Sequence, residues 1–238
     1  MWVDNGGVRL HAIDNERDGS GVPVVTVPGM GEEADEYAWQ LDELGDRRVV
    51  VVDVRGRGRS HAPDEGYTWQ DHFGDVLAVM AATGIDRPVM IGYSRGSPYA
   101  IGAALHSPRG VRGLVVNDYQ ARQVGLGEGM TDTLLQMTIR GRTTAERMSE
   151  HAVRGVAIAS IEIPLWDRLA ELDAPVLVLR GGKSWIVDDE AQAQYLAASP
   201  SVRIDTLPDR GHGLWSATDR TPYLAKLLPF LDEVDAAP

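Results

Sequence analysis

A serine between two glycines directly follows an apolar stretch, in "VMIGYSRGS" at residues 89–97. A serine hydroxyl is a weak nucleophile. It attacks an acyl carbon only with a base nearby, an acid that orients the base, and donors for the oxyanion. Small neighbours suit a crowded strand-to-helix turn that exposes such a hydroxyl. The pattern marks Ser94 as a candidate nucleophile, and the plainer alternative is a structural serine in a tight loop.

One histidine, in the last third of the chain, is a candidate base for this nucleophile. The segment "LPDRGHGLW", residues 207–215, places His212 between two glycines, which let a loop bring an imidazole into a crowded site. The remaining histidines fall in an opening hairpin, in helical patterns, in a loop or in a long insertion: His11, His61, His72, His106 and His151. We therefore predict His212 as the general base.

Donors for an oxyanion are predicted on two segments. The turn in "VTVPGMGEEADEY", residues 25–37, follows the first long apolar strand, and its Met30 N–H is one candidate. The Arg95 N–H is the other, because Arg95 opens a helix and the first N–H groups of a helix have no partner within it. A plain Pro-Gly turn is the alternative for the first segment.

Short apolar runs rich in β-branched residues alternate with longer helical patterns. An opening hairpin at 2–13 is followed by predicted strands at 22–27, 47–54, 87–93, 111–118, 174–181 and 201–207. Predicted helices cover 33–44, 68–83, 95–107, 187–198 and 218–235. Most strands are apolar on both faces, as expected for parallel strands covered by helices. The order predicts an α/β protein with a mostly parallel sheet flanked by helices.

Bulk composition narrows the class of protein. The chain has 238 residues, 43% hydrophobic and 24% charged, which suits one globular domain. Its net charge of −12 disfavours nucleic acid and membrane surfaces as partners, because both are polyanionic. The lack of cysteine excludes disulfides and thiol catalysis. With no signal-peptide pattern and no bilayer-spanning run, we expect a soluble, cytoplasmic protein.

One connection is far longer than a crossover helix requires. Between the predicted strands that end at 118 and begin at 174 lies a segment with methionines and leucines at helical spacing. We interpret residues 1–238 as a single domain, with a small helical lid inserted at about 120–172. The alternative is a packed pair of surface helices without a gating role.

Taken together, these motifs resemble the α/β-hydrolase fold superfamily over almost the whole chain. The matching pieces, in the family's order, are "VPGMG", "DVRGRGRS", "GYSRGS", "LVVND", "PVLVLRGGKS" and "DRGHG". The resemblance implies an eight-stranded sheet with a lid after strand six, Ser94 as nucleophile, His212 as base, and Met30 and Arg95 as oxyanion donors. Three arginines in "DVRGRGRS", residues 53–60, suggest phosphate binding, but the resemblance favours a structural loop.

The third member of the expected triad departs from the family. The position after strand seven where the family usually carries an aspartate holds Trp185. Asp188 and Asp189 follow, where helix capping explains them. Some family members place the acid at the end of strand six, and that position holds Asp118. We predict Asp118 as the acid, with Asp188 or Asp189, or no acid, as alternatives.

Aromatic and apolar residues are predicted to wall the pocket. Tyr93, Trp185, Trp215 and Met137 would favour an apolar or aromatic acyl group, unless they are simply core residues. The resemblance implies a serine hydrolase that cleaves an ester or thioester through an acyl-enzyme. The substrate is a small-molecule or carrier-bound acyl compound, and no cofactor or metal is expected. The alternatives are an acyltransferase or cyclase of small-molecule biosynthesis with the same triad, and a non-catalytic ligand-binding protein.

Overall fold

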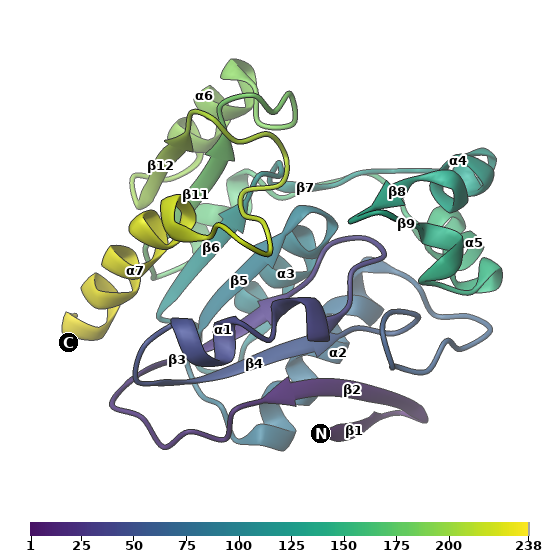
Figure 1. Ribbon diagram of the computed structural model, residues 1–238, viewed down its shortest axis with the longest axis horizontal. Coiled ribbons are helices and arrows are strands. Elements are labelled where there is room, and N and C mark those ends of the chain that lie inside the picture. Colours follow the sequence, from purple (N-terminus) through teal and green to yellow (C-terminus); the bar gives the residue numbers. More distant parts are fainter. Residues whose placement is uncertain (238) are drawn as a thin grey trace.

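The computed structural model describes residues 1–237, so that Pro238, the last residue of the predicted domain, lies outside the described residues. Its main sheet has eight strands in the order β1-β2-β4-β3-β5-β6-β11-β12 (Figure 1). Their bounds are β1 Trp2–Asn5, β2 Val8–Asp14, β3 Gly21–Val27, β4 Arg47–Asp53, β5 Val89–Tyr93, β6 Gly113–Asn117, β11 Val176–Gly181 and β12 Val202–Leu207. The predicted fold class and strands are confirmed.

The central strands are apolar on both faces because helices cover both sides of the sheet. In the main sheet β4, β3, β5, β6, β11 and β12 pair in parallel, whereas β1 and β2 form an antiparallel hairpin at one edge and β2 pairs antiparallel with β4. Successive residues such as Val24 and Val25 belong to opposite clusters of the core. This alternation follows from the period of two of a strand.

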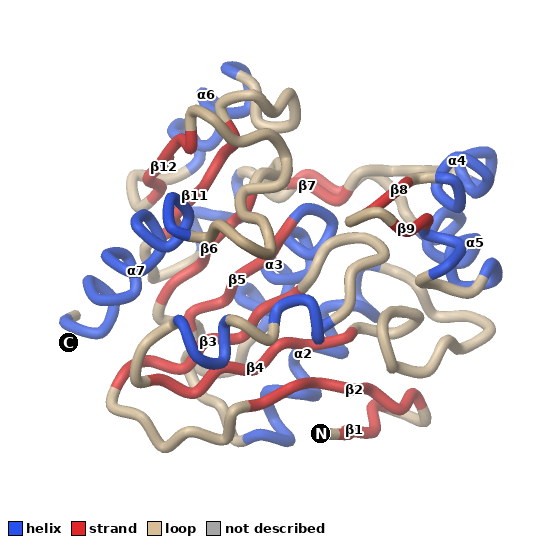
Figure 2. The backbone as a smooth tube through the Cα atoms, in the orientation of Figure 1, coloured by secondary structure: helices blue, strands red, loops and turns tan. Residues whose placement is uncertain are grey.

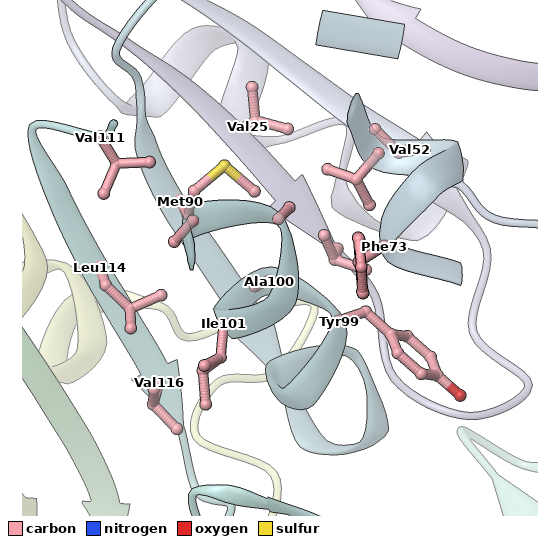
Figure 3. Packing of buried hydrophobic residues seen from close by; sticks show 14 of the residues in the cluster. Val25, Val52, Phe73, Met90, Tyr99, Ala100, Ile101, Val111, Leu114 and Val116 are labelled. Carbon is pink, nitrogen blue, oxygen red and sulfur yellow. The ribbon is translucent and has the colours of Figure 1, made fainter. Parts of the chain in front are cut away.

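Five helices flank the sheet: α1 Gln40–Glu43, α2 Trp69–Thr83, α3 Ser97–His106, α6 Asp189–Ala198 and α7 Thr221–Ala236. Buried residues of α2, α3 and α6 share one core cluster, and those of α7 share the other. In Figure 3, side chains of α3 such as Ile101 lie over the strands that carry Met90, Leu114 and Val116. No helix among residues 1–237 is long and apolar enough to cross a membrane.

One predicted helix is wrong in form. Residues 33–44 make a short 3-10 turn, η1 Ala34–Tyr37, and the one-turn helix α1 rather than a continuous helix. The first turn is fixed by a capping box between Glu33 and Glu36, while Tyr37 is fully buried against the sheet. Tertiary packing of this segment outweighs its helical propensity.

The long connection between β6 and β11 forms a separate insertion beside the sheet (Figure 1). The sequence predicted a helical insertion, but the structure shows a mixture of short helices, short strands and loops. Figure 2 shows much loop in it, broken by short helices. Its elements are β7 Arg122–Gln123, η3 Glu128–Met130, α4 Thr131–Gln136, β8 Thr138–Ile139, β9 Arg142–Thr143, η4 Thr144–Glu146, α5 Glu150–Ala159, β10 Ile163–Pro164 and η5 Asp167–Glu171. Gly141 adopts a left-handed φ of +80° in the β8–β9 hairpin, where a helix cannot continue.

Arginines dock this insertion on the acidic loop that follows β3. Arg147 makes a bidentate pair with Glu36 at 2.8 and 2.9 Å, and its side chain is almost fully buried. Arg140 donates from Nε to Glu32 Oε1 at 2.8 Å. Planar guanidinium–carboxylate pairs of this kind fix orientation as well as proximity. The insertion is therefore held against the same loop that supplies the Met30 turn.

A buried histidine on α2 makes stability depend on pH. His72 stacks on Tyr99 with ring centroids 4.4 Å apart, and its Nδ1–H donates to the Thr68 carbonyl at 2.7 Å. Burial, reinforced by nearby Arg57, lowers the pKa of His72 well below its usual range. Below a pH of about 6.5 His72 is protonated in the unfolded chain but stays neutral in the native protein. The free energy of unfolding therefore falls as the pH drops below that value.

The His72→Phe variant is expected to lose part of this acid sensitivity, because phenylalanine can stack but cannot take up a proton. His72 contributes a decline of up to about 1.4 kcal/mol per pH unit below pH 6.5. Urea unfolding at pH 7.5, 6.5 and 5.5 measures it, with His61→Gln as an exposed control. An unchanged decline in His72→Phe would assign the acid sensitivity to other groups.

Candidate active site

Ser94 stands on a sharp turn between β5 and α3, where η2 spans Ser94–Gly96. Its φ is +48°, a left-handed value that costs a non-glycine residue roughly 1–2 kcal/mol. The flanking residues must be glycines because neighbouring backbone atoms leave no room for a Cβ at either position. A Cβ on Gly96 would lie 2.2 Å from the Val27 carbonyl oxygen, and one on Gly92 would lie 2.4 Å from Ser97 Cα. The turn thus presents Ser94 at the carboxyl end of the sheet.

The structure brings Ser94, His212 and Asp118 together in one chain of hydrogen bonds. His212 Nε2 lies 2.9 Å from Ser94 Oγ, and His212 Nδ1 lies 2.8 Å from Asp118 Oδ2. A carboxylate oxygen accepts, so the proton of the neutral imidazole sits on Nδ1 and the lone pair of Nε2 faces the serine hydroxyl. This arrangement lets His212 accept a proton from Ser94.

Asp118 follows β6 directly and is fully buried, with a left-handed φ of +46°. Its Oδ1 accepts from the Gly181 N–H at 3.0 Å, and its Oδ2 also accepts from Ser184 Oγ at 2.5 Å. Three donors, including His212, thus hold the carboxylate in one orientation. Buried carboxylates are retained where they are hydrogen-bonded in this way.

The alternative acids lie elsewhere. Asp188 caps α6, where its side chain accepts from the Ala191 N–H at 2.8 Å. Asp189 begins that helix and is exposed. Sequence reasoning missed Ser184, which donates to Asp118 from the very loop where the family usually carries its acid. A serine next to the unexpected Trp185 was the available signal.

The turn after β3 passes directly beside Ser94. A Cβ on Gly29 would lie 3.2 Å from Ser94 Cβ. The Met30 N–H donates to no acceptor among the described residues, while the neighbouring Gly29 N–H donates to Glu32 at 3.0 Å. Glu32 is buried and also accepts from Tyr37 Oη at 2.5 Å. These contacts fix the turn, with a free donor at Met30.

Arg57 also holds this turn in place, through hydrogen bonds to its carbonyl groups. Its Nη1 donates to the carbonyl oxygens of Pro28 and Gly29 at 3.1 and 3.0 Å. The side chain is buried, and burial lowers its pKa. The phosphate interpretation of this loop is not supported. Arg55 is buried in a pair with Asp75 and Arg59 pairs with Asp35 on the surface, so that none of the three arginines is left to bind an anion.

A cavity of about 370 Å³ opens on Ser94 and His212. Its other lining residues come from the β3 turn, the insertion and the His212 loop: Gly29, Met30, Glu32, Tyr93, Met137, Thr138, Ile139, Arg140, Gly213 and Trp215. Of the four predicted wall residues, Tyr93, Met137 and Trp215 line it. Trp185 does not. Its side chain is 84% exposed, because the loop after β11 turns its serine, and not its tryptophan, toward Asp118.

Tyr93 supports the imidazole from one side. Its ring stacks on His212 with centroids 5.1 Å apart, and its hydroxyl donates to the His212 carbonyl at 2.9 Å. Burial, together with nearby Glu32, raises the pKa of Tyr93, so that the phenol stays protonated and remains a donor. Within residues 1–237, no group of three or more acidic or histidine side chains could hold a metal ion.

Comparison with known sequences fixes the family. The profile of the alpha/beta hydrolase family matches residues 24–224, and the chain belongs to that family. It is 34% identical to the N-formylmaleamate deformylase of Pseudomonas putida, over 97% of this chain and 95% of that protein. It is 26% identical to the 3-hydroxybutyrate-oligomer hydrolase of Cupriavidus necator, over 76% of this chain and 78% of that protein. These relatives are hydrolases.

Solved structures show the same fold. An esterase from Exiguobacterium antarcticum has a TM-score of 0.78 at 20% identity, covering 98% of this chain and 99% of its own. The N-formylmaleamic acid deformylase of Pseudomonas putida S16 has a TM-score of 0.73 at 22% identity, covering 94% of this chain and 98% of its own.

Proposed function

We propose that this chain is a serine hydrolase that cleaves ester or thioester bonds of small acyl compounds through an acyl-enzyme on Ser94. The observation that carries the proposal is the continuous hydrogen-bond chain from Ser94 Oγ through His212 to the buried Asp118, at 2.9 and 2.8 Å. The adjoining cavity of about 370 Å³ is at the small end of ligand sites, which supports a compact substrate.

The chemistry proceeds in two halves. Ser94 Oγ attacks the acyl carbon while His212 Nε2 takes its proton, and the N–H groups of Met30 and Arg95 stabilise the oxyanion. His212 then gives the proton to the leaving group, whose bond to the acyl carbon breaks. Water attacks the acyl-enzyme with His212 again as base, which releases the acid and restores Ser94. Asp118 holds the imidazole and stabilises its charged form.

Hydrolysis of an N-formyl amide is a second candidate. It is favoured by the 34% identity to a deformylase over nearly the full length of both chains. The same steps apply, except that the leaving nitrogen must be protonated as it departs. His212 Nε2, which has just accepted the Ser94 proton, can supply it.

The first experiment is labelling with a fluorophosphonate, read by intact mass. The wild type is expected to gain one adduct, because an activated serine attacks phosphorus as it attacks an acyl carbon. Ser94→Ala and His212→Ala should remain unlabelled. The matched control Ser216→Ala, on the loop that carries His212, should label as the wild type does.

Other outcomes separate the alternatives. Labelling of Ser94 with acyl transfer to added alcohols or amines outrunning hydrolysis would favour an acyltransferase or cyclase. A folded wild type that resists labelling would mean that Ser94 is not activated, and a ligand-binding role would replace the enzyme.

A further inference from the structure

Among the described residues, Arg140 is the one Arg or Lys side chain that lines the Ser94 cavity. It stands at the tip of the β8–β9 hairpin of the insertion, far from Ser94 in sequence. Its Nε donates to Glu32 at 2.8 Å, and its guanidinium carbon lies 5.7 Å from the centre of the Trp215 ring. Among the described residues, the terminal Nη groups of Arg140 have no hydrogen-bond partner.

The partner carboxylate has little capacity left. Glu32 Oε1 accepts from Arg140, and Glu32 Oε2 accepts from the Gly29 N–H and from the Tyr37 hydroxyl. Arg140 has five N–H donors and uses one of them in this pair. The group that can still bind a ligand at this wall of the cavity is therefore a cation with free donors, although a carboxylate lies behind it.

The backbone at this position is costly for arginine. Arg140 has a φ of +48° and Gly141 one of +80°, and they connect the paired strands β8 and β9 as a two-residue turn. Such turns favour asparagine, aspartate or glycine at the first position. Residues held in sparsely populated conformations cluster at ligand-binding sites. The side chain at this tip is thus a candidate for a functional role.

We propose that Arg140 binds a carboxylate of the substrate, so that the site acts on small acyl compounds that carry a carboxylate away from the scissile bond. This inference rests on the proposed function of Ser94. A planar guanidinium with free Nη donors matches a carboxylate, which it can hold through two parallel hydrogen bonds. A phosphate dianion fits less well, because one cation beside a carboxylate would have to offset two charges.

The overall charge of the chain makes a local cation important. A protein with a net charge of −12 repels an anionic substrate at long range. At the cavity wall, Arg140 also replaces part of the hydration that a carboxylate loses on entry. Without such a donor, burial of an anion beside Trp215 and Met137 would be strongly unfavourable.

The test compares matched ester pairs, with spontaneous hydrolysis subtracted. One pair is 4-nitrophenyl hydrogen glutarate and its methyl ester, which puts the carboxylate on the acyl side. The other is 4-acetoxybenzoate and its methyl ester, which puts it on the leaving group. The wild type is expected to favour the carboxylate member of at least one pair in kcat/KM. Arg140→Gln should lower that preference about 10- to 100-fold, as expected for loss of a hydrogen-bonded charge pair.

Two further variants keep the proposal falsifiable. Arg142→Gln, on the same hairpin but paired with Glu33 and half exposed, should retain the preference. Arg140→Lys keeps the positive charge but lacks the two parallel N–H donors of a guanidinium, so it should retain part of the preference. Equal loss on both members of each pair in Arg140→Gln, or no preference in the wild type, would overturn the proposal. Fluorophosphonate labelling of the same variants reports on Ser94 separately, so failure of the serine-hydrolase function is recognised by itself.

Discussion

The Asp118→Asn variant is expected to hydrolyse esters with kcat lowered about 10³- to 10⁴-fold, the size of effect that this substitution has in Ser-His-Asp triads. An amide offers one acceptor oxygen where Asp118 now serves His212, Ser184 and Gly181. If the amide nitrogen faces His212, the imidazole must present a lone pair at Nδ1 and a proton at Nε2. His212 then cannot accept the Ser94 proton.

Asp188→Asn is the matched control, because this was the alternative acid. Asp188 caps α6, and asparagine is also a good cap, so that both kcat and the free energy of unfolding should stay near the wild-type values. Steady-state kinetics on a nitrophenyl ester and urea unfolding of both variants provide the measurement. A large loss of kcat in Asp188→Asn, with Asp118→Asn still active, would show that Asp188, and not Asp118, is the acid of the triad.

The position of Asp118, the proposed acid, could be inferred from the family resemblance and from what a strand end can reach. β6 lies beside β5 in the sheet, so the residue after β6 lies near the residue after β5. Trp185 cannot accept a hydrogen bond in the place of a carboxylate, so Asp118 was predicted as the acid, with Asp188 or Asp189, or no acid, as alternatives. The structure places Asp118 against His212, as that reasoning predicts. The support from Ser184 was missed, because a serine in a loop carries no periodic signal and its place next to Trp185 was the one available cue.

The cavity wall was predicted less well, because it depends on contacts between distant segments. Trp185 was expected to wall the pocket from its neighbourhood in sequence, yet its side chain points into solvent. Arg140 and Glu32 were not singled out. They are 108 residues apart, and neither lies in a long periodic element. Arg140 and the acidic loop come together only when the insertion docks on the loop after β3.

The sheet was predictable down to its strands because buried parallel strands are continuous apolar runs. The segment 33–44 was not, since α1 and η1 are too short for helical periodicity to fix them. Their form depends on Tyr37, which is buried and hydrogen-bonded to Glu32. The local hydrophobic pattern therefore gave a wrong prediction, a continuous helix, in the loop next to the Met30 turn.

Arg57 is a buried cation that the fold does not need for its core. Among the described residues, Arg57 has no carboxylate partner and its Nε is unpaired. Burial lowers the pKa of Arg57, so the charged form is disfavoured in the native state. Its hydrogen bonds instead hold the carbonyl groups of Pro28 and Gly29. With these carbonyls turned toward Arg57, the next N–H, that of Met30, can face the cavity. We infer that Arg57 is a positioning residue for the turn that carries Met30, the proposed oxyanion donor.

The Arg57→Met variant is expected to lose kcat by about 10²-fold, with KM nearly unchanged, because an oxyanion donor that is no longer aligned acts in the transition state alone. Its free energy of unfolding should change by less than about 2 kcal/mol. Loss of the two charged hydrogen bonds is offset by the removal of a cation that was costly to bury. Steady-state kinetics, the rate of fluorophosphonate labelling and urea unfolding give the three readouts.

Arg55→Met provides the opposite case on the same loop. Arg55 pairs with the fully buried Asp75 through both Nε and Nη2, so methionine would leave an uncompensated carboxylate in the interior. That change should cost about 3–5 kcal/mol of stability, with kcat of the remaining folded protein close to the wild type. If Arg57→Met were as unstable as Arg55→Met, or kept its kcat, Arg57 would be a structural residue only. The contrast separates a charge kept to hold the fold from one kept to align a backbone N–H.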